Sequence, residues 1–261
     1  MSELFTRFSA LLRSVRESEI KADVTLSDRL ILARAGKIAI SYAPFEHIQD
    51  RARIVLVGIT PGAQQASNAL IEARRQLVAG ADNATALKAA KTFASFSGAM
   101  RSNLVSMLDH IGVSQWLGLG STSALWSDRT DLVHFTSAIR YPAFIDGKNY
   151  NGQPAMSAVP LLKDILIRCL AEEARALSGA LWIPLGPVAE QGVTLLVREG
   201  IIGHSKVLSG LPHPSPANVE RIMYFVGQKP RHLLSAKTNA EKLDGVRSSI
   251  MSQVAALPPA E

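Results

Sequence analysis

Two short segments of the sequence carry residues that could do chemistry on a polar ring or an anion. The first is GITPG (58–62), a glycine-bounded turn that opens onto a helix and presents backbone N–H groups and a positive dipole end. The second is HPSP (213–216), in which two prolines fix the backbone around the imidazole of His213 and the hydroxyl of Ser215. An imidazole can donate a hydrogen bond or a proton, and Ser215 can cap the next helix or bind a phosphate oxygen.

Several other chemistries are excluded. GITPG is not followed by the Gly-Lys-Ser/Thr of a phosphate-binding P-loop, and Pro61 breaks the small-residue spacing of a dinucleotide site. The single cysteine, Cys169, excludes an intrachain disulfide, a thiolate zinc site and a four-cysteine iron–sulfur cluster. Because Cys169 falls on the apolar face of a predicted helix, it indicates a buried structural thiol in a reducing compartment, and we expect a cytoplasmic protein.

The composition is that of a folded, enzyme-sized chain. It has 261 residues, of which 47% are hydrophobic, and a net charge of +6 that favours a polyanionic partner. No apolar run reaches the roughly 18 residues that a membrane span needs, so we expect no membrane partner. We expect a single domain over 1–254, in which 1–49 form a helical extension with a helix near 3–19, followed by a disordered tail over 255–261.

An alternation of strands and helices must position the two segments. The predicted strands are apolar without clean alternation, which is typical of a parallel sheet covered on both faces. They span 53–58, 132–138, 180–186 and 206–212. The predicted helices span 63–79, 98–111, 160–177, 187–199 and 218–226, with Gly112 and Gly200 beyond two of their ends and Pro187 at the start of one. The alternation predicts an α/β fold, in which the turn-rich segment 141–156 is a loop beside the second strand.

The polar segments of this sequence follow the predicted strands. Ligands of open α/β sheets bind outside the carboxyl ends of the strands. GITPGAQQ, TSAIRYP and HPSPANVER each begin at such an end, and so does the Gly-Pro pair after the third strand. We therefore expect these segments to lie close together.

Taken together, GITPG and HPSP resemble the two signature motifs of the uracil-DNA glycosylase superfamily. GITPG is similar to the GINPG or GMNPG of the mismatch-specific and single-strand-selective branches, and HPSP is similar to the second motif of several branches. Between them, SFSGAMRSNLVSMLDHIG resembles the segment from which the family stacks a phenylalanine on the flipped base, here Phe96. The resemblance covers roughly residues 50 to 230.

The resemblance implies a three-layer α/β/α fold with a central four-stranded parallel sheet. It also implies a monomeric, monofunctional DNA glycosylase of base excision repair that needs no metal and no cofactor. Such an enzyme flips a base out of single- or double-stranded DNA, because the glycosidic bond is unreachable within the stack. His213 then donates to the departing base, and backbone amides around Gly58 to Gly62 stabilise it further. Ile59 and Pro61 of the same turn are expected to contact the base.

The sequence departs from the family pattern at four positions. Thr60 stands where the mismatch-specific branch has its water-positioning Asn; a threonine hydroxyl can orient a water but cannot act as a general base. Ile59 replaces an acidic residue of other branches, and Ala217 is small for a wedge that fills the space of a flipped base. The base-reading Asn is replaced by Ser137, or by Thr136 or Phe135 in another alignment.

Other side chains are candidates for the missing roles. Gln64 or Gln65 could hold the water or read a base edge, and Asp146 could enter the site from its loop. Asp131 and His134 are expected to make surface or capping bonds. Basic and amide side chains near the strand ends are expected to contact DNA phosphates. They are Arg101, Asn103, Arg140, Asn218, Arg221, Lys229 and Arg231, together with Ser215.

Two other functions stay open on the sequence. A module that recognises modified DNA without turnover would explain why Thr60 replaces the Asn. An enzyme acting on free nucleosides is a third possibility, although the sequence lacks the acidic cluster expected to bind calcium.

Overall fold

The computed structural model describes residues 3–259. The chain divides into two compact units, each built from three stretches. Unit 1 comprises Met1–Asp50, Gly58–Ser95 and Phe135–Ser178. Unit 2 comprises Arg51–Val57, Phe96–His134 and Gly179–Glu261.

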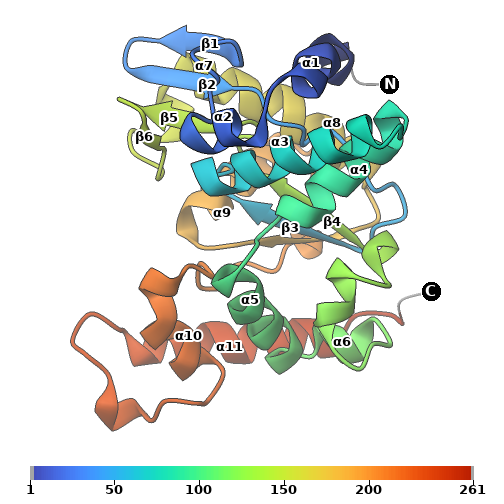
Figure 1. Ribbon diagram of the computed structural model, residues 1–261. Coiled ribbons are helices and arrows are strands. Elements are labelled where there is room, and N and C mark those ends of the chain that lie inside the picture. Colours follow the sequence, from blue (N-terminus) through green and yellow to red (C-terminus); the bar gives the residue numbers. More distant parts are fainter. Residues whose placement is uncertain (1–2, 260–261) are drawn as a thin grey trace. The chain divides into compact units, whose positions relative to one another are not determined.

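Helices supply most of the regular structure (Figure 1). The α-helices are α1 (Glu3–Ser14), α2 (Glu17–Ala22), α3 (Ala63–Val78), α4 (Asn83–Ala94), α5 (Ala99–His110), α6 (Val113–Trp116), α7 (Pro160–Ile165), α8 (Ala171–Ala176), α9 (Pro187–Arg198), α10 (Val219–Phe225) and α11 (Ala240–Ala255). The strands are β1 (Ile31–Ala35), β2 (Ile38–Ser41), β3 (Ile54–Gly58), β4 (Val133–Ser137), β5 (Ala143–Ile145), β6 (Lys148–Asn149) and β7 (Leu181–Pro184).

The parallel sheet has three strands in the order β4-β3-β7. In β3 and β7 every residue is buried, as expected for strands covered on both faces, and Ile54 pairs with Leu181 in parallel register. The α/β class and three of the predicted strands are therefore confirmed.

The prediction of a fourth strand at 206–212 is wrong. This segment makes a single parallel bridge, between Val207 and Trp182, and the N–H of Leu208 donates to the carbonyl of Trp182. Gly210 then adopts φ +99°, which turns the backbone out of the extended conformation, and Pro212 has no N–H to donate. The sheet thus has three strands and one bridged segment instead of four strands.

A second, antiparallel sheet in unit 1 was not predicted. Its order is β1-β2-β5-β6, and Figure 1 shows it as two hairpins. The turn between β5 and β6 is Asp146-Gly147, with φ of +48° and +75°, the conformation that a tight two-residue hairpin requires. The segment 1–49 is therefore not wholly helical, and the predicted loop 141–156 contains a hairpin.

The helix predictions hold with small changes. The helices predicted after the strands begin and end within two residues of α3, α5, α9 and α10. Gly112 and Gly200 are left-handed beyond the ends of α5 and α9, and Pro187 begins α9. The helix predicted near 3–19 is two helices, because Arg16 has extended φ/ψ between α1 and α2. The helix predicted at 160–177 contains a π-helical turn at Leu166–Leu170.

Three helices, α4, α6 and α11, were not predicted. Of the predicted tail, residues 260–261 lie outside the described residues, and the indole N–H of Trp116 donates to the carbonyl of Pro258 at 2.7 Å. Within residues 3–259, no helix is both long enough and apolar enough to cross a membrane.

Candidate functional site

The turn 58–62 lies at the end of β3, and Thr60 ties it to the start of β5. The hydroxyl of Thr60 donates to the carbonyl of Tyr141 at 2.9 Å and accepts from the N–H of Ala143 at 3.0 Å. Its single proton is therefore used by the backbone. Thr60 has a structural role here, and its role in holding a water stays a prediction.

The start of α3 is closed by side chains of unit 1. The N–H of Ala63 donates to Oδ1 of Asn149 at 2.9 Å, and the N–H of Gly62 donates weakly to Oε1 of Gln65 at 3.4 Å. A Cβ on Gly62 would lie 3.3 Å from the amide nitrogen of Asn149, so this contact is close. The amide of Gly62, which was expected to face a ligand, and the neighbouring amide of Ala63 are thus bonded within the protein. Asn149 was missed because it lies in the unpredicted hairpin.

The other residues of this turn are partly buried. Gly58 and Pro61 are buried and Ile59 is half-buried. Gln64 is exposed and its side chain donates to Asn68, one helical turn away, at 2.9 Å. The contacts that these residues were expected to make with a base stay predictions.

The end of β4 narrows the choice of base-reading residue. Phe135 is buried, and the hydroxyl of Thr136 donates to the carboxylate of Glu173 at 2.5 Å. Ser137, in contrast, is half-buried. The role of Ser137 as the base-reading residue stays a prediction.

Glu173 is the centre of a buried ionic network in unit 1. It is fully buried, Nε of Arg140 donates to it at 2.9 Å, and Nζ of Lys91 lies 3.9 Å away. Lys91 also donates to the carbonyl of His47 at 2.6 Å. Burial lowers the pKa of Lys91 to about 8, although the carboxylate of Glu173 opposes this shift.

Arg140 is not a phosphate-contact residue. It is buried, and it also donates to the carboxylate of Glu172 and to the carbonyl of Cys169, both at 2.9 Å. Burial disfavours its charge, but the carboxylates of Glu173 and Glu172 outweigh burial and raise the pKa of Arg140. Cys169 lies in the π-helical turn and is half-buried, and burial raises the pKa of its thiol, as expected for a structural cysteine.

His213 lines a pocket of about 510 Å³ in unit 2, which we call the His213 pocket. The backbone N–H of Ser215 donates to Nδ1 of His213 at 3.2 Å. A neutral imidazole that accepts at Nδ1 carries its proton on Nε2. Burial lowers the pKa of His213, so the ring is neutral at pH 7 and Nε2–H is the donor. The pocket is lined by Pro187, Glu190, Ser209, Gly210, Leu211, Pro212, His213, Asn218, Arg221, Lys237, Asn239, Lys242, Leu243 and Val246.

Three contacts hold the backbone of the HPSP segment. The side chain of Asn103 donates to the carbonyl of Pro214 at 2.9 Å, and that of Asn218 donates to the carbonyl of His213 at 3.2 Å. Gly186, with φ +83°, packs so closely that a Cβ there would lie 2.8 Å from Cβ of His213. Ser215 precedes a short 3₁₀ turn, and within the described residues its hydroxyl makes no capping bond.

The predicted phosphate contacts divide into two groups. Lys229 and Arg231 are neutralised by carboxylates, Glu220 at 2.8 Å and Glu241 at 3.2 Å. Arg221, in contrast, donates to Oδ1 of Asn218 and to a backbone carbonyl.

Of two further predicted residues in unit 2, Arg101 lies in the first turn of α5 and Phe96 lies just before this helix. The guanidinium of Arg101 lies over the ring of Trp126, 5.4 Å from its centroid, and burial lowers the pKa of Arg101. Phe96, just before α5, is buried and has a left-handed backbone with φ +48°. Its stacking on a base stays a prediction.

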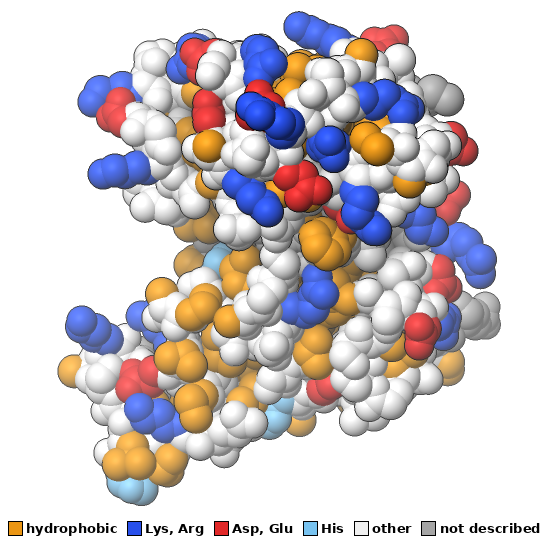
Figure 2. Space-filling model, in the orientation of Figure 1, with side chains coloured by type: hydrophobic (Ala, Val, Ile, Leu, Met, Phe, Trp, Pro, Cys, Tyr) orange, Lys and Arg blue, Asp and Glu red, His pale blue; other side chains and the backbone are white. Residues whose placement is uncertain are grey.

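Sequence reasoning missed several residues around the His213 pocket. Lys237 and Lys242 flank the start of α11, which Asn239 and Glu241 signal as a cap and an acidic first turn. On α10 the apolar side chains Val219 and Met223, four residues apart, are exposed. Figure 2 shows apolar surface over α10 and the segment that follows it.

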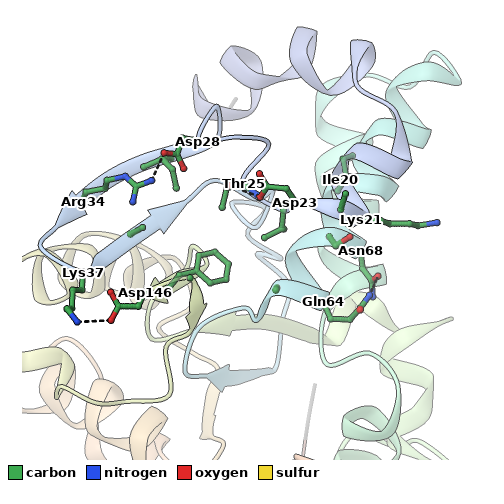
Figure 3. Close-up of a pocket in the computed structure, with 18 of the residues that line it drawn as sticks. Ile20, Lys21, Asp23, Thr25, Asp28, Arg34, Lys37, Gln64, Asn68 and Asp146 are labelled. Carbon is green, nitrogen blue, oxygen red and sulfur yellow. Dashed lines mark hydrogen bonds and ion pairs between the residues drawn. The ribbon is translucent and has the colours of Figure 1, made fainter.

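A second cavity, of about 860 Å³, lies in unit 1 (Figure 3). Its cations are paired: Arg34 with Asp28 at 2.6 Å and Lys37 with Asp146 at 3.0 Å. Asp146 is thus a hairpin-turn residue that pairs with Lys37, and its entry into the site as a base stays a prediction.

The two residues expected to make surface or capping bonds differ in their surroundings. Asp131 pairs with Arg129 at 3.1 Å, as expected. His134 is buried within β4, so it is not a surface residue.

Comparison with known proteins adds a family but no activity. No protein-family model matches the chain, and no solved structure matches it. It is 36% identical over 225 residues to a Bacillus subtilis (strain 168) protein described as "Uncharacterized protein YoxB". The aligned region covers 85% of this chain and 88% of YoxB. With that identity over most of both chains, the protein belongs to the same family as YoxB.

Proposed function

We propose that the protein is a DNA glycosylase that flips uracil or another modified base out of DNA and hydrolyses its N-glycosidic bond. The observation that carries the proposal is the hydrogen bond from the N–H of Ser215 to Nδ1 of His213, because a neutral ring that accepts at Nδ1 has its proton on Nε2 and can donate it. In the reaction the C1′–N bond breaks and its electron pair leaves with the base. A neutral imidazole donor stabilises the negative charge that builds on the departing ring, and water supplies the hydroxyl for C1′ and a proton for the base.

The surroundings of His213 support a DNA substrate. Arg221, Lys237 and Lys242 line the same pocket, and cations bind DNA mainly through its phosphates. The exposed apolar pair Val219 and Met223 on α10 could fill the space left by a flipped base, which Ala217 is too small to fill.

A second function is favoured by one specific contact. The hydroxyl of Thr60, the group that the resemblance would use to orient the water, is bonded to the backbone of Tyr141 and Ala143. A protein that binds modified DNA without cleaving the glycosidic bond would tolerate this arrangement.

Base release from labelled oligonucleotides tests the proposal. The panel carries uracil, hypoxanthine, xanthine, thymine opposite guanine, and hydroxymethylated or glucosylated cytosine, each in single and double strands. We expect release of one of these bases, and a loss of about 10²-fold or more in His213→Ala, the size of effect seen when one donor to a developing anion is removed. His204→Ala, an exposed histidine of the same unit, is the matched control and should retain activity.

The two functions give different outcomes. Release that depends on His213 but survives in Thr60→Ala identifies a glycosylase in which another group holds the water. Intact binding of a modified oligonucleotide, with no release of any base, contradicts the glycosylase and supports the recognition module.

A further inference from the structure

Three cations of the His213 pocket have no carboxylate partner among residues 3–259. Within residues 3–259, no Asp or Glu oxygen lies within 4.0 Å of the charged nitrogens of Arg221, Lys237 or Lys242. Among the described residues that line the pocket, Glu190 is the one carboxylate. The pocket therefore carries a positive excess that an anionic ligand would compensate.

The neighbouring cations show that this is a local feature. The other Lys and Arg residues between positions 220 and 250 each form an ion pair, as do Arg34 and Lys37 in the cavity of unit 1. The pairs are Lys229 with Glu220, Arg231 with Glu241 and Arg247 with Asp244, at 2.8, 3.2 and 2.8 Å. In this part of unit 2, the cations without an acidic partner are those that line the His213 pocket.

Hydrogen bonds connect the guanidinium of Arg221 to the backbone of Lys237 and, through Asn218, to the backbone of His213. The guanidinium of Arg221 donates to Oδ1 of Asn218 at 2.8 Å and to the carbonyl of Lys237 at 3.3 Å. The amide of Asn218 in turn donates to the carbonyl of His213. The backbones of α10, the segment before α11 and the HPSP segment are thus held together.

Packing fixes the third cation. Oδ1 of Asn239 accepts from the N–H of Lys242 at 2.9 Å and so begins α11 at this position. Further along the helix, a Cβ on Gly210 would lie 2.8 Å from a methyl carbon of Val246, so α11 is closely packed on the segment that leads to His213. The backbone of Lys242 therefore has a defined place on the pocket wall, and its side chain is exposed.

We propose that Arg221, Lys237 and Lys242 form a phosphate-binding subsite of the His213 pocket, which holds a phosphodiester of the DNA strand on which His213 acts. The strand assignment rests on the proposed function. A strand is favoured over a free phosphate because the three side chains are exposed and come from separate segments, so they can follow a backbone. The C-terminal segment 237–246 is then part of the binding site.

The salt dependence of DNA binding tests the subsite. Fluorescence anisotropy with an unmodified single-stranded oligonucleotide compares the wild type with the double variant Lys237→Gln/Lys242→Gln. Loss of two phosphate contacts should make the slope of log K against log salt shallower by about 1.4. The control Arg198→Gln/Lys206→Gln removes two exposed cations of the same unit, away from the pocket, and should leave the slope unchanged. Equal slopes for the two double variants would overturn the subsite.

Protection of individual lysines from acetylation, read by mass spectrometry, distinguishes the sources of phosphate. The oligonucleotide should protect Lys237 and Lys242 but not Lys206. Protection by dUMP or inorganic phosphate, but not by the oligonucleotide, would reject the strand and leave a site for a small phosphate ester. Absence of protection by all three ligands would reject the subsite altogether.

These measurements do not depend on catalysis. If the protein releases no base but DNA still protects Lys237 and Lys242 from acetylation, the glycosylase is rejected and the subsite is kept. If the protein releases a base but DNA protects neither lysine, the glycosylase is kept and the subsite is rejected. Both double variants should unfold at the same temperature as the wild type. This result establishes that the substitutions of exposed cations leave the fold intact.

Discussion

Gly186→Ala is the substitution that most directly tests how His213 is held. Gly186 is the N-cap of α9 and has φ +83° and ψ 169°, a region that is essentially restricted to glycine. An added Cβ would lie 2.8 Å from Cβ of His213 and 3.3 Å from its backbone nitrogen. Neither atom is the end of a flexible side chain, so the backbone of one segment must move.

The expected cost follows from two terms. The backbone conformation costs a non-glycine residue about 1–3 kcal/mol, and overpacking of a tight contact costs about 1–3 kcal/mol. Because a shift that relieves the clash also relieves part of the strain, we expect a loss of about 3 kcal/mol in the free energy of unfolding. For a chain of this size that is a decrease of about 6–12 °C in Tm. Displacement of the imidazole should also lower base release by on the order of 10²-fold.

Urea denaturation and thermal unfolding measure the effect, with Gly179→Ala as the control. Gly179 has no positive φ, and nothing lies within 4 Å of the Cβ that would be added, so its change should stay within about 0.5 kcal/mol. If Gly186→Ala were as stable as Gly179→Ala, the close contact with His213 would not constrain the segment, and the reasoning would be refuted.

Three other predictions concern stability. Thr60→Val removes the donor to Tyr141 and the acceptor of the Ala143 N–H, so urea denaturation should show a loss of about 2 kcal/mol that Thr60→Ser largely restores. Burial lowers the pKa of Lys91 from 10.5 to about 8, so between these values the unfolded chain binds more protons and the contribution of Lys91 to stability rises with pH. Urea denaturation at pH 7.5, 8.5 and 9.5 should show this rise relative to Lys91→Met; a constant difference would contradict it. Gly245→Ala, in open space within α11, should stabilise the chain by about 1 kcal/mol in thermal unfolding, and a decrease in Tm would contradict this.

The parts of the fold that could be predicted from the sequence are those with a strong local signal. The apolar runs that form β3, β4 and β7 and the proline and glycine at the ends of α9 are such signals. The bridged segment 206–212 has a similar apolar run, but its backbone is set by the φ of Gly210, which an apolar pattern does not reveal.

The antiparallel sheet was missed for a different reason. Its strands are short, and β1 and β2 lack the alternation of buried and exposed residues that indicates a strand. The Asp146-Gly147 pair was the available signal, because this dipeptide favours the turn in which both residues have positive φ.

The candidate site was predictable in its motifs but not in its partners. The two prolines around His213 were visible in the sequence, whereas its hydrogen bond from Ser215 and its contact with Gly186 depend on folding. Arg140 has the residue type of a phosphate contact, yet its distant partner Glu173 makes it a buried structural charge. Long-range pairing of this kind has no signature in a local pattern.

Each unit is built from stretches that lie far apart in the sequence, and this has a consequence for synthesis on the ribosome. The edge of β3 that pairs with β7 is translated early, and its first partner contact, between Ile54 and Leu181, needs a residue made much later. At the usual rates of about 5–20 residues per second, that edge stays open for on the order of ten seconds. A nascent or truncated chain that ends before Leu181 therefore exposes an unpaired apolar strand edge, which chaperones must shield from aggregation.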